Sequence, residues 1–352
     1  MDNVNCKTSP LGGALRNHSN ACDDGGFIHP KELRKAFLRR GLLIGVDLGG
    51  TNTVFGIVDN EGNIVCENSI KTQAYPDIHD FVEACVQCVN PLIDQIGGKQ
   101  FVGGMGIGAP NANFYTGTIE EAPNLPWKGK VPLAQMLSER LGLKVVMTND
   151  ANAAAMGEMA YGAARGMRHF VVITLGTGVG SGIVIDGKLV YGSDGFAGEL
   201  GHMIIDPSPT ARLCGCGRRG CLETYCSARG IVRTAEELIA SGRPTLLRNV
   251  SDLSALEIFK AAKQDDAVAI ETFRRTGETL GAACANITTF CSPEAYIFFG
   301  GPMHSHEFIF PALIETYNRQ VLPIYRNRCK FLLSELMDRN AAVLGAAALC
   351  HE

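Results

Sequence analysis

The feature that most limits the fold of this chain is a short pattern that occurs twice. Leu48–Thr51 is followed by Gly56–Asp59, and Leu175–Gly178 is followed by Gly182–Asp186, so a Gly/Thr turn and then a Gly-Ile-Val run with an aspartate occur in the same order in both. Each copy predicts a strand, a Gly/Thr turn, a second strand, a tight turn and a third strand. Such an internal repeat indicates two related α/β halves that face each other, with their glycine turns lining one cleft from both sides.

Apolar runs and helical stripes extend both copies into larger units. The runs predict strands at 42–49, 54–58, 64–70, 103–107, 145–147, 170–175, 183–185, 189–191, 296–299 and 331–333. Helices are expected at 78–96, 133–141, 151–164 and 341–349, and the chain should be mostly helical from the cysteine-rich segment to 285. We therefore expect a small α/β domain from 41–150 plus 338–352, and a large one from 151–337.

Residues 1–40 are expected to form an N-terminal extension with a short basic helix at Pro30–Arg40. That helix is either a docking or DNA-binding element or a packed entry helix. A helix-turn-helix module needs at least two helices with their turn, which favours the packed helix.

Composition excludes several classes of protein. Hydrophobic residues make up 46% of the chain, charged residues 19%, and the net charge is −4, so we expect a soluble globular protein without a nucleic-acid partner. No apolar run is long enough for a membrane helix, so no membrane partner is expected. Most of the 13 cysteines are scattered through apolar runs, which favours buried free thiols in a reducing cytoplasm.

Both glycine turns present backbone N–H groups without a Cβ in the way, which is how a phosphate oxygen is bound. The candidate residues are Gly49, Gly50, Thr51, Asn52 and Thr53 in the first turn, and Gly176, Thr177, Gly178 and Gly180 in the second. One such turn alone is often only structural, but the duplicated pair favours phosphate binding. The chain has no G-x-x-x-x-G-K-[ST] motif, so a P-loop is excluded.

Two aspartates follow predicted strands at positions suited to phosphoryl transfer. Asp47 ends the first strand and is a candidate to hold Mg²⁺ through water, or else a turn-capping residue. Asp150 follows Asn149 and opens the alanine-rich helix, where it is either a base for an attacking hydroxyl or a helix N-cap. The two roles of Asp150 are compatible, because a helix N-terminus keeps a carboxylate ionised.

A cluster of cysteine and histidine follows the second repeat. Cys214, Cys216 and Cys221 lie within eight residues, and His202 stands twelve residues before Cys214. Three thiolates and one imidazole are the ligand set of a structural tetrahedral zinc site, and the alternative is a glycine-rich turn with unrelated free cysteines. Glu199 and Glu223 bracket the cluster and are not needed for zinc, so we expect them to grip a polar ligand together with His202.

With these segments in view, the chain from about Leu43 to its C-terminus resembles the ROK family of repressors, open reading frames and sugar kinases. The pair Gly-Glu-Leu-Gly-His at 198–202 and Cys-Gly-Cys-Gly-x-x-Gly-Cys-Leu-Glu at 214–223 is highly specific to that family. The resemblance implies the two-domain, actin-like and ribonuclease-H-like ATPase fold with an interdomain cleft, which agrees with the internal repeat.

The resemblance also implies roles for individual residues. It makes Asp150 the catalytic base, Asn149, Glu199, His202 and Glu223 ligands of sugar hydroxyls, and His202 with the three cysteines the zinc ligands. Asn124 belongs to a segment that borders the other side of the sugar, both glycine turns hold the phosphates of ATP, and Gly300 and Gly301 lie near the adenosine. One departure is Asn111, in a loop that borders the sugar, where the family usually has the last glycine of Gly-x-Pro-Gly; asparagine tolerates the left-handed conformation that glycine would supply.

The leading hypothesis from this resemblance is a cytoplasmic ATP-dependent hexose kinase of carbohydrate metabolism that forms glucose 6-phosphate, with Mg²⁺ and structural zinc, as a homo-oligomer. A kinase for N-acetylglucosamine or another hexose is the alternative within the same chemistry. The alternative of another class is a sugar-responsive transcriptional repressor. Such a repressor carries a full winged helix-turn-helix before the first glycine turn and tends to lose kinase residues, whereas here 46 residues precede Asp47, and Asp47, Asp150 and both turns are present.

Overall fold

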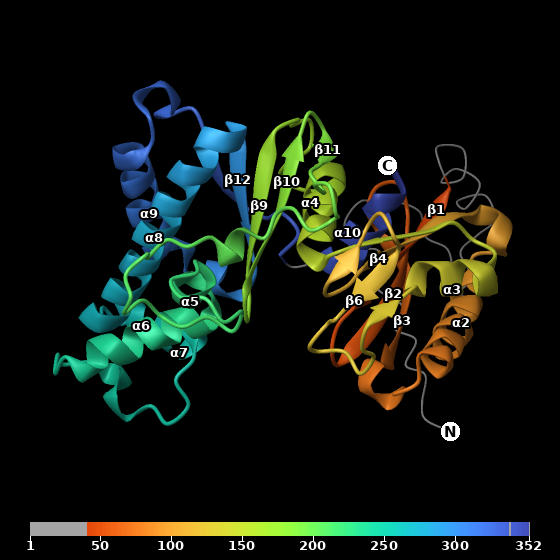
Figure 1. Cartoon of the computed structure of the whole chain (residues 1–352), viewed down its shortest axis with the longest axis horizontal. Coiled ribbons are helices and arrows are strands. Elements are labelled where there is room, and N and C mark those ends of the chain that lie inside the picture. The colour runs from red at the N-terminus through yellow and green to blue at the C-terminus, as the bar shows by residue number, and fades with distance from the viewer. Residues whose placement is uncertain (1–40, 338, 352) are drawn as a thin grey trace, which may run out of the picture. The chain divides into compact units, whose positions relative to one another are not determined.

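The computed structural model describes residues 41–337 and 339–351 (Figure 1), so the basic helix expected at 30–40 lies outside the described part of the chain. These residues form two compact units. The first unit contains residues 41–162, Tyr191–Phe196 and 339–351, and the second contains Ala163–Val190 and Ala197–Met337. The first unit therefore extends twelve residues past the expected boundary at 150, and it includes a segment from the middle of the chain.

The first unit is built on a five-stranded sheet with the order β3-β2-β1-β4-β8. The strands are β1 (Leu42–Leu48), β2 (Asn52–Val58), β3 (Ile64–Lys71), β4 (Val102–Gly108) and β8 (Val145–Thr148). Strands β1 to β3 form an antiparallel meander, and β1, β4 and β8 run parallel to one another.

Side chains alternate between the two faces of this sheet along β1, and different helices cover each face. Ile44, Val46 and Leu48 join one apolar core with helices α2 (Ile78–Gln95) and α3 (Leu133–Leu141). On the other face a Cβ at Gly45 would lie 1.9 Å from the Val343 carbonyl oxygen, so helix α10 (Ala341–Ala348) rests directly on the sheet. Helix α4 (Asp150–Tyr161) packs on α10. Asp47 is two residues after Gly45 in the same strand, so its side chain lies on the same face of the sheet as α10.

The second unit repeats this plan with the strand order β11-β10-β9-β12-β13. Its strands are β9 (Phe170–Leu175), β10 (Val179–Ile185), β11 (Lys188–Leu189), β12 (Ala295–Phe299) and β13 (Lys330–Leu333). Strands β9 to β11 form the antiparallel part, while β9, β12 and β13 are parallel. The order and directions match the first sheet strand for strand, which confirms the duplication predicted from the two glycine turns.

Helices form most of the remaining second unit. They are α5 (Glu223–Cys226), α6 (Ala228–Ala240), α7 (Ala255–Ala262), α8 (Ala267–Cys291) and α9 (His306–Gln320). Figure 1 shows α8 and α9 running side by side, and both contribute to the apolar core of this unit. Helix α9 was not expected from the sequence; Pro311 inside it removes a backbone donor and makes the segment a poor helix on propensity alone.

A small three-stranded sheet was also not expected. It joins β5 (Ala112–Asn113), β6 (Thr118–Glu120) and β7 (Lys130–Val131) in the first unit. Strands of two or three residues are too short to show a period of two, so the sequence pattern carries no signal for them. In the described residues, no helix combines the length and the hydropathy needed to cross a membrane.

Candidate active site

The first glycine turn joins β1 to β2 and is closed by its own backbone. The Gly49 N–H donates to the Asn52 carbonyl at 3.0 Å, and the Thr72 hydroxyl donates to the Gly49 carbonyl at 2.8 Å. The Thr53 hydroxyl is fully buried and lies 2.9 Å from that of Thr72. Thr53 therefore stabilises the turn from the interior of the protein, whereas Thr51 and Asn52 are exposed.

Asp47 and Asp150 lie at the same end of the first sheet. Asp47 is paired with Gly108 across β1 and β4, and a Cβ at Gly108 would lie 3.8 Å from the Asp150 Cα. Asp150 is the first residue of α4, but the N-cap is Asn149, whose side-chain oxygen accepts from the Asn152 N–H at 2.7 Å. Because Asn149 performs the capping, the exposed Asp150 carboxylate is not needed for it.

The charge of Asp150 disfavours ionisation of Asp47. Burial, and to a smaller extent this nearby charge, together raise the pKa of Asp47 to about 6. The pKa of Asp150 is also raised, because surrounding protein displaces water, although the N–H of Ala151 at 2.8 Å opposes this effect. Asp150 nevertheless keeps solvent-accessible surface. A cation beside the pair relieves the repulsion, which makes this end of the sheet suited to a divalent ion.

The segment that contains Asn124 is fastened to the first glycine turn. The Gln73 side-chain amide donates to the Gly50 carbonyl at 2.6 Å and to the Asn124 carbonyl at 3.1 Å. The Trp127 indole N–H donates to the Tyr75 carbonyl at 3.1 Å. Asn124 itself is exposed beside the turn. Gln73 could not be predicted from the sequence, since a glutamine between unrelated segments carries no local pattern.

Asn111 adopts the left-handed conformation expected of it, with a φ of 51°. Its side-chain amide donates to the carbonyls of Glu120 at 3.0 Å and Glu121 at 3.3 Å. The loop therefore keeps the backbone that a glycine would adopt, and the asparagine adds a cross-link that a glycine lacks.

In the second unit, Glu223 lies directly against the second glycine turn. Its Oε2 accepts from the Val179 N–H at 3.1 Å, and a Cβ at Gly178 would lie 2.4 Å from the same oxygen. Only glycine fits at 178 while this carboxylate holds its place. A Cβ at Gly201 would lie 2.0 Å from the Val179 carbonyl oxygen, so the Glu199–His202 turn also abuts the start of β10.

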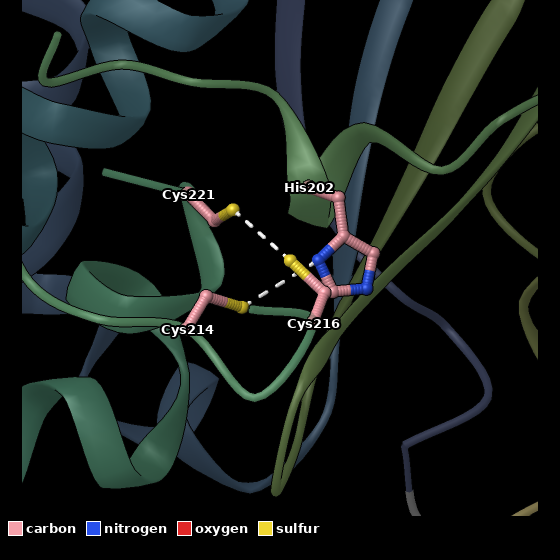
Figure 2. Close-up of side chains that lie close together, drawn as sticks. All are labelled: His202, Cys214, Cys216 and Cys221. Carbon is pink, nitrogen blue, oxygen red and sulfur yellow. Dashed lines mark hydrogen bonds between the residues drawn. The ribbon is translucent and has the colours of Figure 1, made fainter. Parts of the chain in front are cut away.

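The His202, Cys214, Cys216 and Cys221 side chains converge in the second unit (Figure 2). The four donor atoms all lie within 4.8 Å of one another. Cys216 Sγ is 3.7 Å from Cys221 Sγ, and Cys214 Sγ is 3.7 Å from His202 Nδ1. With Zn–S bonds of about 2.3 Å, a tetrahedron places two sulfur ligands about 3.8 Å apart. These separations fit zinc, and they are far longer than the roughly 2 Å of a disulfide.

Neighbouring groups favour a thiolate at Cys216, whereas burial raises the pKa values of Cys214 and Cys221. Backbone and side-chain N–H groups of Arg218 hold the pKa of Cys216 below its usual range, at about 6. The Arg218 guanidinium also donates to the His202 carbonyl at 3.0 Å. Glu223 Oε1 lies 3.8 Å from Cys214 Sγ, so one carboxylate contacts both the cluster and the second glycine turn.

Gly300 and Gly301 follow β12 in the second unit. Phe299 pairs with Thr174 of β9, just before the second glycine turn, so the expected adenosine-binding glycines adjoin the expected phosphate-binding turn. The structure thus gathers Asp47, the first turn, Asn124, Asn149 and Asp150 in one unit, and the second turn, the glycine pair, Glu199, His202, Glu223 and the cysteines in the other.

Comparison with known proteins identifies the class of protein that this fold and these residues define. The ROK family model matches residues 43–352, so the chain belongs to the ROK family. Its two matching sheets are those of the actin-like ATPase fold adopted by ROK sugar kinases of known structure.

The chain is similar to both kinases and repressors within this family. The chain is 34% identical to a glucokinase of Streptomyces coelicolor over 320 residues, which covers 89% of this chain and 98% of the relative. A ROK family glucokinase from Streptomyces griseus, solved in complex with glucose and AMPPNP, is 36% identical with a TM-score of 0.71, over 88% of this chain and 99% of that one. A xylose repressor of Caldicellulosiruptor bescii is 31% identical, over 88% of this chain and 78% of the repressor.

Proposed function

We propose that this protein is an ATP-dependent hexose kinase that transfers the γ-phosphoryl group of ATP to the C6 hydroxyl of glucose. The observation that carries the proposal is the pair of carboxylates at the end of the first sheet. Asp150 is exposed at the start of α4, where Asn149 is the N-cap, and Asp47 lies nearby at the entrance to the first glycine turn. The similarity to glucokinases, one of them solved with glucose and AMPPNP, supports the substrates.

In the proposed mechanism Asp150 accepts the proton of the attacking hydroxyl. A late-acting base in phosphoryl transfer needs an ionised carboxylate in the right place; the first turn of α4 sets the place of Asp150, and its Ala151 N–H opposes the rise in pKa that burial causes. Backbone N–H groups of the two glycine turns hold the phosphates of ATP. Asp47 would hold Mg²⁺ through water, and the ion would supply neutralisation of charge on the β- and γ-phosphates.

The remaining polar side chains are proposed to bind the sugar. Asn124 and Asn149 contribute amides from the first unit, and Glu199, His202 and Glu223 contribute from the second. Hydroxyl groups bind well to carboxylates and to an imidazole nitrogen, because each hydroxyl can both donate and accept. His202 Nδ1 faces the cysteine cluster (Figure 2), which leaves Nε2 for a sugar hydroxyl.

We propose that the cluster holds one structural Zn²⁺ through His202, Cys214, Cys216 and Cys221. A closed set of four protein ligands leaves no position for a substrate, so the ion stabilises the loop and takes no part in the reaction. The stabilised loop ends at Glu223, which contacts the second glycine turn.

A sugar-responsive repressor is the competing class, since a xylose repressor shares the family. Fold alone does not separate the two. The accessible Asp150, the adjacent Asp47 and the two glycine turns favour the kinase, because sugar binding without catalysis requires no base and no phosphate site. An N-acetylglucosamine kinase would use the same residues, and only the fit at C2 distinguishes it.

The test is ADP release measured with a coupled assay, using the purified full chain, Mg·ATP and a panel of hexoses and N-acylhexosamines. The expected result is turnover with glucose and formation of glucose 6-phosphate. A kcat/KM for N-acetylglucosamine tenfold or more above that for glucose would replace the substrate but keep the mechanism. Absence of turnover with every sugar, in protein that still binds glucose, would favour the repressor class.

A further inference from the structure

The segment Tyr191–Phe196 belongs to the first unit, although the residues on both sides of it belong to the second. We call this segment the strap. It is fixed to the β5–β6 hairpin by side chains of consecutive hairpin residues. The Tyr115 hydroxyl donates to the Gly192 carbonyl at 2.7 Å, and the Asn113 amide donates to the Asp194 carbonyl at 2.8 Å. The ring of Phe114 stacks on that of Tyr191, with centroids 4.0 Å apart and planes 7° apart.

Asn113 is the centre of this attachment. It is 3% exposed, and its oxygen accepts from the backbone N–H groups of Tyr115 at 3.0 Å and Thr116 at 3.4 Å. Its amide nitrogen also donates to the Glu120 carboxylate at 3.3 Å. A Cβ at Gly195 would lie 2.6 Å from the Asn113 oxygen, and Gly195 has a φ of 89°, so the strap follows the hairpin closely only with glycine there.

The strap ends three residues before Glu199, and the residues beyond it are fixed by a different element. The buried Ser181 of β10 donates its hydroxyl to the Gly198 carbonyl, and the Leu200 N–H donates to the Ser181 hydroxyl at 3.4 Å. The backbone of Glu199 is thus held directly on both sides by Ser181, while the chain that leads to it is held by the hairpin. Both hydrogen bonds from the hairpin go to carbonyls of the strap, those of Gly192 and Asp194, and the Tyr191 ring adds the stacking contact with Phe114.

The same hairpin lies between two segments expected to border the sugar. Asn111 precedes it and cross-links its far end at Glu120, and Asn124 follows it four residues after Glu120. A displacement of the hairpin would therefore affect the Asn124 segment directly and the Glu199–His202 turn through the strap.

We propose that Asn113 and Tyr115 are positioning residues for hexose binding: they hold the strap, and through it they support the chain that enters the Glu199–His202 turn, whose backbone Ser181 holds directly. Neither side chain is required to touch the substrate. This inference rests on the proposed sugar-binding role of Glu199 and His202. It implies that loosening the strap weakens sugar binding while leaving ATP binding and the chemical step nearly unchanged.

The first test variant is Tyr115→Phe, which removes one hydroxyl from a side chain on a residue that is 56% exposed, so the fold should tolerate it. We expect the KM for glucose to rise about three- to tenfold, as for the loss of one hydrogen bond, with kcat and the KM for ATP within about twofold of wild type. The dissociation constant of glucose, measured by calorimetry without ATP, should rise by the same factor. Tyr75→Phe is the matched control, because no hydrogen bond of its hydroxyl is found among the described residues.

The second variant is Asn113→Ser, which keeps an acceptor for the Tyr115 N–H but loses the donor to Asp194. It should also raise the KM for glucose and leave the KM for ATP nearly unchanged. The rise for glucose should be larger than in Tyr115→Phe. Hydrogen exchange of residues 191–203 should be faster than in wild type, and glucose should protect them less.

The outcomes separate this inference from the function on which it rests. Unchanged glucose affinity in both variants overturns the inference, and so does a fall in melting temperature with equal changes in the two KM values. Wild-type protein that phosphorylates no hexose defeats the proposed function, and the calorimetric glucose affinity then still decides whether the strap positions the sugar site.

Discussion

Asp47→Asn should make the ligand-free protein more stable at neutral pH while it removes kinase activity. Asp47 lies partly buried at the end of β1, on the sheet face covered by α10 and α4, and burial with the charge of Asp150 raises its pKa to about 6. An ionised Asp47 is therefore less favourable in the folded chain than in the unfolded one. Asparagine keeps the shape but never carries the charge.

The magnitude follows from the pKa difference. A rise from 3.8 to about 6 corresponds to a free-energy penalty of at most ~3 kcal/mol for the ionised folded state, at about 1.4 kcal/mol per pKa unit. Partial exposure of Asp47 reduces this, and we expect Asp47→Asn to raise the free energy of unfolding by about 1–3 kcal/mol at pH 7.

The sign of the pH dependence is fixed by the same shift. Because the folded pKa lies above the unfolded one, the contribution of protonated Asp47 is present below about pH 4 and is lost as the pH rises through about 6. The difference between Asp47→Asn and wild type should therefore nearly vanish at pH 4. At pH 7, Mg²⁺ with AMPPNP should stabilise the wild type more than the variant, since a bound cation relieves the penalty.

The assay is urea unfolding of both proteins at pH 4 and pH 7, without nucleotide or divalent ions, with zinc content checked in each. Asp94→Asn, at an exposed position on α2, is the matched control for the chemical change itself. A variant that is no more stable than wild type at pH 7, or whose advantage is the same at both pH values, would refute the argument.

Asp150→Asn should lower kcat by ~10²–10⁴-fold with far less change in glucose affinity, measured by steady-state kinetics and calorimetry, because the amide cannot accept a proton. Metal analysis should find about one zinc per chain, and Cys216→Ser should lower both metal content and melting temperature; folded, active protein without zinc would contradict this. Gly178→Ala should raise the KM for ATP and lower kcat, since its Cβ would lie 2.4 Å from the Glu223 carboxylate, whereas Gly176→Ala meets no atom within 4 Å and should have the smaller effect. 2-Deoxyglucose should have a lower kcat/KM than glucose by ~1–3 kcal/mol, because one polar group of the proposed sugar site loses its hydrogen-bond partner; equal values for the two sugars would contradict the proposed sugar site.

The parts of the fold that could be predicted from sequence are those with a strong local pattern. β1 and β9 are apolar runs that end in glycine turns, and α3 has an apolar stripe closed by Gly142, so these elements were placed to within about a residue of their observed bounds. The repeated glycine turns also predicted that the two halves share one plan, because the same local pattern is expected to form the same strands in each unit.

The parts that could not be predicted depend on contacts between distant segments. The sequence of the strap predicts a loop. Its place in the first unit depends on contacts with residues such as Asn113 and Tyr115, some eighty residues earlier in the chain. Asn149 and Asp150 are adjacent and both suit a helix N-cap, so spacing could not say which one caps and which one remains available. The path of the chain from β8 into α4 determines that Asn149 is the N-cap and that Asp150 is not.

The glycine turns show how a structural and a functional demand can fall on the same residue. Sequence alone offered phosphate binding or a structural hairpin as alternatives for Gly178. The structure shows a steric reason for glycine that involves no phosphate: the Glu223 carboxylate occupies the space of a Cβ. That carboxylate also binds the Val179 N–H and contacts the cysteine cluster. Glycine at 178 therefore lets the Glu223 carboxylate, a proposed sugar ligand, lie against a proposed phosphate-binding turn, so the structural and the functional interpretation of this glycine are compatible.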